Sequence, residues 1–314
     1  MLPRPRRANS GGIQVGRNLE RSAPTILGWG TPPRGPRGRR SLSLDESNEN
    51  KSDRVDAEYL ARIGRLDPAL LYPLRHRSAE TQADLTILRS RAALVRVRAN
   101  LANFMRGVVK SAGGRIPQCD TRYLARMAEL HLPDELVSAL SPIVATIADL
   151  DARITAYNKQ IEKMAKERYP ETELLRQVPS VGPITATTFV LTVEDPTRFP
   201  RARVMGSYLG LRPRQGDSGM LKPQLRITKA GDKNLRSLLV ECAHHLLGRL
   251  GPDTDLKRWG LKLAERGGKS AKKRAVIAVA RKLSVLLLRL WVTGEVYEPL
   301  RNARLRGELL EPAP

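Results

Sequence analysis

The sequence predicts a mainly α-helical protein with long helices, and two observations carry this expectation. Hydrophobic residues make up 41% of the 314 residues and aromatic residues only 4%, so Leu, Ile, Val and Ala must build the core. Leu, Ala, Arg and Glu, which favour helices, are abundant. Apolar residues also recur with heptad spacing in two long segments between residues 80 and 170. A chain of this length can hold two or three domains.

The formal net charge of +23 indicates a polyanionic partner. Such a surplus attracts nucleic acid first and anionic membranes second. No apolar run has the length of a membrane span, and the amino terminus lacks the apolar segment of a signal peptide. Cys119 and Cys242 are too few for a disulfide framework or a metal quartet, so we expect a cytoplasmic protein. We interpret the adjacent His244 and His245 as helix residues and not as metal ligands.

Residues 1–44 differ from the rest of the chain. They contain nine Arg, one Glu and no Lys, and they are rich in Pro and Gly. Too little apolar surface is available there to offset the entropy of ordering the chain. We expect a disordered basic arm. It is either a non-specific nucleic-acid contact or a segment without a function of its own.

Ordered structure is expected to begin close to Lys51. Ser52 can cap a helix, and Asp53 and Asp56 would then lie in its first turn, where carboxylates interact favourably with the helix dipole. Their spacing of three places both carboxylates on one face. Two such carboxylates can also share a magnesium ion, although spacing alone favours the capping role.

Two long segments then carry the heptad patterns of coiled-coil seams. The second seam runs from Ile143 to Met164, and Ser141-Pro142 is predicted to start its helix. The two helices form either an internal hairpin or a dimerisation arm, and sequence periodicity does not separate these alternatives. The first seam consists of Ile87, Leu94, Leu101 and Val108, with Val97 and Phe104 between them.

The segment from Val178 to Ala186 resembles a helix-hairpin-helix turn. In that motif a glycine-containing turn points backbone N–H groups at a DNA phosphate. Gly182 is therefore a candidate nucleic-acid-binding residue, and Ser180 stands where the motif usually has its first glycine. Residues 187–193, which follow, could be helix or strand.

The stretch from Gly206 to Cys242 is the most basic part of the chain's centre, since residues 201–240 contain nine Lys or Arg against two Asp. Ser218-Gly219 lies on its Gly- and Pro-punctuated loop. Arg forks match phosphate oxygens in pairs and Lys adds point charge, so this serine suits a phosphate-handling site. A solvated basic loop with an incidental serine is the alternative. The candidate nucleic-acid-binding side chains are Arg212, Arg214, Arg226, Lys229, Lys233 and Arg236.

Two further helices are predicted near the carboxyl terminus. Residues 235–250 carry a Leu-rich stripe, and residues 275–291 form an apolar packing helix. The basic run between them contains Lys272 and Lys273, which are either phosphate contacts or solvated surface residues.

The stretch after Tyr208 resembles the carboxy-terminal transposase domain of the insertion-sequence one-ten family, also catalogued as one-sixteen and nine-oh-two. The resemblance covers about Lys51 to Arg301. It implies a DNA transposase with Ser218 as the catalytic serine, magnesium as cofactor, a structured guide RNA as partner and a homo-oligomer formed through the coiled coil. The matching residues are Tyr208–Pro213, Ser218-Gly219, Arg226–Gly231 and Leu235-Arg236.

The resemblance also implies catalytic, metal-binding roles for Asp53 and Asp56. They match the last two acids of the family's Asp-Glu-Asp-Asp tetrad, which lies in a domain similar to RNase H and to the RuvC resolvases. The family carries its first two acids on earlier strands, and nothing upstream in this sequence has a strand pattern. We therefore expect a remnant of that domain, an amino-terminal truncation and impaired activity. A non-catalytic nucleic-acid-binding remnant of such an element is the alternative function.

These expectations divide the chain into five parts and place it in the cytoplasm, associated with the nucleoid. The parts are a basic arm (1–44), the remnant of the nuclease-like domain (45–79), a coiled-coil region (80–170), the carboxy-terminal transposase domain (171–301) and a tail (302–314).

Overall fold

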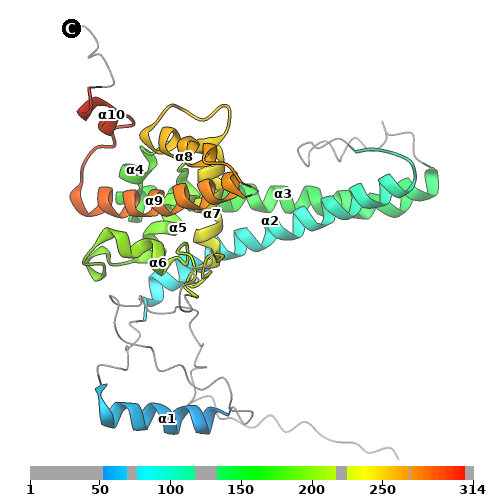
Figure 1. The fold of residues 1–314 in the computed structure, drawn as a ribbon. Helices are drawn as coiled ribbons and strands as arrows, with labels where there is room; N and C mark the ends of the chain where they lie inside the picture. The colour runs from blue at the N-terminus through cyan, green and yellow to red at the C-terminus, as the bar shows by residue number, and fades with distance from the viewer. Residues whose placement is uncertain (1–51, 69–75, 117–132, 217–224, 269, 308–314) are drawn as a thin grey trace, which may run out of the picture.

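The computed structural model describes residues 52–68, 76–116, 133–216, 225–268 and 270–307 (Figure 1). Within these ranges the regular elements are helices, and the only β-type pairing is an isolated antiparallel bridge between Pro213 and Ile227. The prediction of a mainly α-helical fold is therefore confirmed for the described residues. The predicted basic arm, residues 1–44, lies outside them.

The described helices form a separate first helix, a long two-helix arm and a body. The first helix is α1 (Asp53–Leu66), and the arm consists of α2 (Ala79–Ser111) and α3 (Asp134–Arg168). The helices of the body are α4 (Glu171–Arg176), α5 (Pro183–Val193), α6 (Met205–Tyr208), α7 (Lys233–Leu247), α8 (Asp255–Glu265), α9 (Ala271–Thr293) and α10 (Arg301–Leu305), with the 3₁₀-helices η3 (Pro196–Arg198) and η4 (Ala202–Val204) between α5 and α6.

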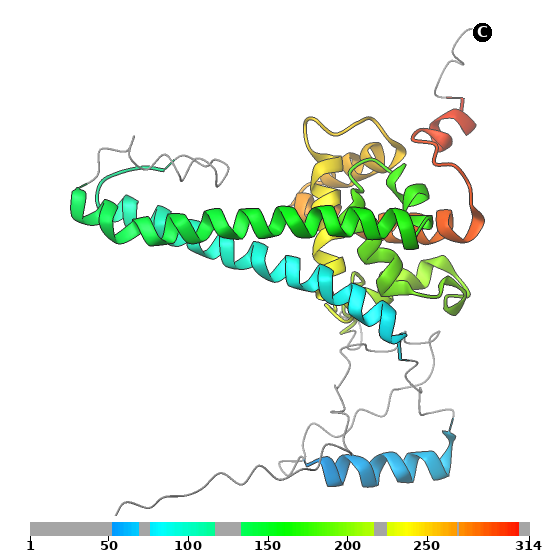
Figure 2. The same cartoon turned by 180° about the vertical axis from the view of Figure 1, so that it is seen from behind.

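Helix α1 begins where the sequence predicts. The backbone N–H of Val55 donates to the Ser52 hydroxyl over 3.4 Å, and Asp53 and Asp56 lie in the first turn. The capping role of these residues is therefore confirmed. Helix α1 contains no buried residue and lies apart from the other helices in both views (Figures 1 and 2).

Helices α2 and α3 pack along each other and project from the body as an arm (Figures 1 and 2). The predicted second seam is buried within this chain: Ile147, Ile154 and Ile161 are each at most 4% exposed. One apolar cluster fills the outer part of the arm around Met105, and a second lies at its base around Leu85. The structure thus shows the internal hairpin, which the sequence left as one of two alternatives.

The predicted first seam is wrong, because the residues of α2 that face α3 lie one position further along the heptad than predicted. Helix α2 buries Leu85, Leu88, Ala102, Met105 and Val109. The predicted seam is only half-buried, and Val97 and Phe104 between its members are 46% and 53% exposed. The heptad spacing is common to both sets of residues, so periodicity alone could not decide which of them faces α3.

The predicted start of the second helix is also wrong. Helix α3 begins at Asp134, after Pro133 at its N-cap, and Pro142 lies inside the helix. Asp134 and Glu135 supply the acidic first turn. An internal proline removes one helix hydrogen bond. Burial of Leu140 and Ile147 on either side of Pro142 against α2 favours the continuous helix.

The body has one core, to which α4–α9 all contribute. Its largest buried side chain is Phe189 of α5, whose ring meets Trp291 of α9 edge-on at a centroid distance of 6.4 Å. Residues 187–193 are therefore helical, and α5 is buried along its whole length because α2, α3, α4 and α7 pack around it. Helix α9 contacts α6, α7 and α8 and forms the body's central support.

The arm is fixed to the body at its base. Asp84 of α2 accepts a hydrogen bond from the Tyr169 hydroxyl at 2.6 Å and pairs with Arg168. Arg77 donates to the Thr192 carbonyl at 2.9 Å. Among the described helices, none combines the length and apolar character that a membrane span requires.

Candidate nucleic-acid interface

The two chain segments that flank Ser218 are paired with each other. The Arg214 N–H donates to the Arg226 carbonyl, and the Thr228 N–H donates to the Arg212 carbonyl, each over 2.9 Å. A Cβ atom added to Gly216 would come within 2.8 Å of the Leu225 side chain, so the segments remain adjacent up to these residues. Ser218 itself lies outside the described residues. Its two flanks form the base of a hairpin, defined here as residues 210–216 and 225–230.

Two glycines close the hairpin base against α6. Gly231 has a φ of +76°, and a Cβ there would lie 2.1 Å from the Tyr208 carbonyl oxygen. Gly210 has a φ of +65°, and a Cβ there would lie 2.3 Å from the backbone of Ala230. Both positions therefore require glycine, for the backbone conformation and for the close approach of the two segments.

Arg236 of α7 holds the two hairpin segments together. Its Nη1 donates to the Leu209 carbonyl at 3.0 Å and to the Ala230 carbonyl at 2.8 Å. Burial lowers the pKa of Arg236, while the charge of Asp232 acts in the opposite direction. A side chain predicted to bind nucleic acid is thus engaged within the protein, where it fixes the hairpin's position.

Helix α7 starts directly beneath the hairpin. Asp232 caps it by accepting from the Leu235 N–H at 2.8 Å, and it also pairs with Arg89 of α2. Lys233, the first helical residue, is exposed. The cap fixes the direction of α7 relative to the hairpin and leaves the Lys233 ammonium group at the surface.

The predicted helix-hairpin-helix turn packs against the same helix. Ser180 has a φ of +72°, the left-handed conformation for which glycine is the usual residue. The Ser180 carbonyl accepts from the Cys242 thiol at 3.0 Å, and burial raises the pKa of that thiol. Gly182 is the N-cap of α5, and a Cβ on it would meet open space.

Helix α7 therefore carries both predicted phosphate-contacting elements. The hairpin sits at Asp232, and the turn containing Gly182 sits at Cys242. Ten residues of helix separate these contacts by about 15 Å along the axis. The two elements are fixed relative to each other by one rigid helix.

Most of the other predicted basic residues are exposed. Arg214, Arg226 and Lys229 lie on the hairpin, and Lys272 and Lys273 lie in the first turn of α9. Lys229 has a φ of +57°, which is uncommon for a residue with a side chain. It lines a groove of about 400 Å³ along α7, together with Arg236, His244 and His245.

Sequence reasoning missed Arg203 and Arg281. Arg281 of α9 is half-buried; burial lowers its pKa, and the charges of Arg212 and Arg203 lower it further. Arg203 of η4 and Arg212 of the hairpin are close in the sequence, whereas Arg281 of α9 is far from both. No local pattern signals that they converge.

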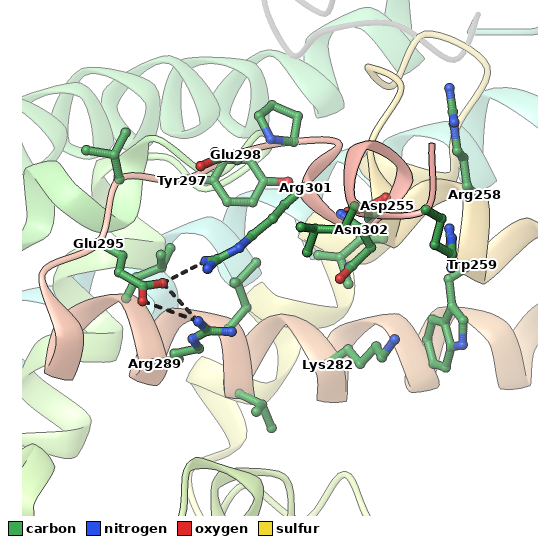
Figure 3. A pocket seen from close by; sticks show the side chains of 18 of the residues that line it. Asp255, Arg258, Trp259, Lys282, Arg289, Glu295, Tyr297, Glu298, Arg301 and Asn302 are labelled. Carbon is green, nitrogen blue, oxygen red and sulfur yellow. Dashed lines mark hydrogen bonds and ion pairs between the residues drawn. The ribbon is translucent and has the colours of Figure 1, made fainter. Parts of the chain in front are cut away.

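A second groove, of about 550 Å³, lies between α8, α9 and the segment that leads into α10 (Figure 3). Arg289 and Arg301 both donate to Glu295, at 2.9 and 2.8 Å (Figure 3). The Lys282 ammonium lies 4.0 Å from the centre of the Trp259 ring. The cations of this groove are largely engaged with the chain's own groups, so we assign it no part of the interface.

Asp53 and Asp56 lie on α1, away from the hairpin in both views (Figures 1 and 2). The structure does not bring these carboxylates to the basic face of the body. Within the described ranges, no group of three or more His, Cys, Asp or Glu side chains could hold a metal ion. The metal-binding role of these two aspartates stays a prediction.

Comparison with known proteins connects this arrangement to transposases. The family described as "Transposase IS116/IS110/IS902 family" matches residues 172–257, which contain the turn, the hairpin and α7. The transposase for insertion sequence element IS1111A of Coxiella burnetii is 30% identical over 256 residues, which cover 79% of this chain and 68% of that protein.

Two further relatives point the same way. The transposase for insertion sequence element IS1328 of Yersinia enterocolitica is 32% identical over 64% of this chain and 60% of its own length. The pilin gene-inverting protein of Moraxella bovis is 31% identical over 46% of this chain and 47% of its own length. The alignments thus span about half to two thirds of these relatives. The identity and coverage shared with the IS1111A transposase show that the chain belongs to the IS116/IS110/IS902 family of transposases.

Proposed function

We propose that the chain binds the DNA of a mobile insertion sequence through the hairpin base and the Gly182 turn, and that it cuts and joins DNA strands through Ser218. One observation carries this proposal. The ends of the Ser218 segment, Gly216 and Leu225, are held together on a paired base surrounded by exposed Arg and Lys side chains. A serine presented on a fixed base among cations suits attack on a phosphodiester.

The chemical step is a transesterification at phosphorus. The Ser218 Oγ forms a bond to phosphorus while the bond from phosphorus to one deoxyribose oxygen breaks. The serine proton passes to a base, and the departing oxygen takes up a proton. A hydroxyl group of a second strand then attacks the phosphoserine and restores the serine. The hydroxyl is a weak nucleophile at neutral pH, so this step requires activation.

A covalent protein–DNA adduct tests the role of the serine. Labelled duplex DNA from the ends of the insertion sequence is incubated with the protein, magnesium and the element's own RNA, and adducts are resolved on a denaturing gel. Because the acidic tetrad is incomplete, we expect only a weak adduct from the unaltered chain, and none from Ser218→Ala. Ser237→Ala, which alters an exposed serine on α7, serves as the matched control and should retain the adduct.

The outcomes separate the possible functions. An adduct that persists in Ser218→Ala contradicts the assignment of the nucleophile. DNA binding without any adduct from the unaltered chain favours the alternative, a non-catalytic nucleic-acid-binding protein. In both cases the salt dependence of DNA affinity reports the phosphate contacts independently of chemistry.

Magnesium remains part of the proposal without a defined site. Carboxylates are suitable ligands for this hard cation, and Asp53 and Asp56 would offer two of them from one helix. A two-metal site holds cations at both the attacking and the leaving oxygen, which needs more ligands than these two. The described residues offer no third candidate in reach.

The proposed partners are a structured guide RNA, which family membership supports, and a second copy of the chain. Because the seam from Ile143 to Met164 is largely buried within the chain, we propose that an oligomer forms through the exposed apolar residues Val97 and Phe104 of α2 instead. Sedimentation of Phe104→Asp tests this. The variant should remain folded and sediment with a lower molecular mass than the unaltered oligomer. An unchanged mass would exclude these residues as the interface. Binding to chromosomal DNA would place the protein at the nucleoid.

A further inference from the structure

Three arginines belong to elements that meet at Gly206: Arg281 runs over this glycine, the Gly206 carbonyl accepts from the Leu211 N–H at 2.9 Å beside Arg212, and α9 contacts η4, which contains Arg203. Arg203 comes from η4, Arg212 from the first hairpin segment and Arg281 from the middle of α9. Burial lowers the pKa of Arg281, and the positive charges of Arg212 and Arg203 lower it further. Helix α9, which is distant in the sequence, thus brings its positive charge to those of two neighbouring segments.

Among the described residues, no acidic side chain pairs with these arginines. No hydrogen bond or ion pair joins the side chain of Arg203, Arg212 or Arg281 to another described residue. Elsewhere in the body, Arg258 pairs with Asp253, and Arg289 and Arg301 share Glu295. Like charges that are held close together without a partner destabilise the free protein, and an anion bound between them removes that cost.

Packing, and not an ion pair, holds Arg281 in place. A Cβ atom on the buried Gly206 would lie 2.7 Å from the Arg281 Cγ and 2.9 Å from its Nε, so the arginine side chain runs directly over this glycine. Helix α9 contacts both α6 and η4, which fixes Arg281 relative to Arg203. The site is therefore built by the fold of the body.

We propose that Arg203, Arg212 and Arg281 form a single binding site for one backbone phosphate of duplex DNA. Guanidinium forks match phosphate oxygens, and three forks from three directions surround a tetrahedral anion better than scattered surface cations do. Arg212 belongs to the hairpin that carries Ser218, so a phosphate bound here fixes the register of the DNA relative to that hairpin. This inference rests on the proposed function, and it adds one shared phosphate site to it.

Binding of a labelled DNA duplex of arbitrary sequence tests the proposal. Affinity is measured by fluorescence anisotropy against salt for the unaltered chain, for Arg212→Gln, Arg281→Gln and their double variant, and for Arg201→Gln. Arg201 is exposed and lies two residues before Arg203, so it controls for the loss of one positive charge from the same surface. A single-stranded RNA of equal length forms the second arm.

We expect each cluster variant to bind duplex DNA about tenfold more weakly, because each loses a charge-assisted contact to phosphate. Arg201→Gln should weaken binding less than about twofold, as expected for an exposed charge. Because both arginines contact the same phosphate, the double variant should lose less than the product of the two single losses. The cluster variants should also keep or raise the melting temperature, since each relieves like-charge repulsion.

A steric variant tests the same site without removing a charge. Gly206→Ala should displace Arg281 and weaken DNA binding, while Gly107→Ala, whose new methyl group meets open space on the arm, should not. Any of three results would overturn the shared DNA site. Arg201→Gln and Arg281→Gln could lose equal DNA affinity, the double variant could lose the full product of the two single losses in affinity, or the losses could appear with RNA alone. If the unaltered chain does not bind DNA, both the proposed function and this inference fail. If it binds and the cluster variants match the control, only this inference fails.

Discussion

The arm and the body of this protein are stabilised in different ways. The arm, α2 and α3, has two small apolar clusters, one around Met105 and one around Leu85, and each involves few helices. The body has one core that gathers buried residues from six α-helices. Since each body helix touches several others, a change in one of them affects the whole domain. Much of the arm depends on a single helix–helix contact.

The body also carries a larger net positive charge than the arm. Residues 171–306 contain 26 Lys or Arg against 12 Asp or Glu, whereas residues 79–116 and 133–168 contain 12 against 8. The region that holds its elements rigidly also carries the larger positive surplus. This agreement favours the body over the arm as the region that would contact DNA in the proposed function.

The largest expected effect comes from the body's core. Phe189→Ala should lower the free energy of unfolding by about 3–5 kcal/mol, because Phe189 is fully buried and its loss leaves a cavity beside Trp291. Chemical denaturation measures this. Phe104→Ala on the arm removes the same group from a 53% exposed position and should change stability by less than about 1 kcal/mol. Similar losses in the two variants would contradict the difference between the regions.

A pair of glycine substitutions should move stability in opposite directions. Gly231→Ala should cost about 2–3 kcal/mol, because its φ is +76° and the new methyl group would overlap the Tyr208 carbonyl. Gly107→Ala in α2 should stabilise by about 0.5–1 kcal/mol, because the methyl group meets open space in a helix. Thermal melts of the two variants compare them directly. A neutral Gly231→Ala would show that the hairpin base is not fixed as described.

The joint between the arm and the body should show an intermediate effect. Asp84→Asn should cost about 2 kcal/mol, because buried Asp84 accepts from Tyr169 and pairs with Arg168. Glu58→Gln alters the exposed Glu58–Arg62 pair of α1 and should be nearly neutral. Urea unfolding curves separate these outcomes. Equal values for the two variants would mean that the joint contributes nothing beyond a surface ion pair.

The smallest expected effect is a pH dependence of stability that comes from Tyr297. Burial and the nearby Asp255 raise the pKa of Tyr297 to about 12. A raised pKa stabilises the fold fully below the unfolded value of about 10, and this contribution is lost as the pH rises toward 12. Melting temperatures of the unaltered chain and Tyr297→Phe should therefore converge over that interval. Parallel curves would contradict the burial of this hydroxyl.

The sequence predicted where helices lie better than which side of each helix is buried. The Ser52 cap and the helix after Asp232 follow from local rules and are confirmed. The buried column of α2 and the start of α3 were wrong, because heptad spacing is shared by neighbouring columns and a proline can lie inside a helix that packs well. For Asp53 and Asp56, only the role in the first turn of α1 is confirmed, and the metal-binding role stays a prediction.

The candidate site was predictable only where it is continuous in sequence. The hairpin and the Gly182 turn are short motifs, and each could be found from its glycines and cations. Arg203 and Arg281 could not be found in this way, because the position of Arg281 depends on the packing of α9 against Gly206 and η4. The internal role of Arg236 was hidden for the same reason, since its acceptors are backbone carbonyls.

Hydrogen exchange of the full chain with and without duplex DNA tests the division of roles between body and arm most directly. The account predicts slower exchange on DNA binding in the hairpin base and around Gly182, because both elements are held against α7 and face the same ligand. Exchange in α2 and α3 should stay unchanged by DNA. Protection confined to the arm, with the hairpin base and the Gly182 turn unaffected, would contradict the central claim that the body binds the DNA.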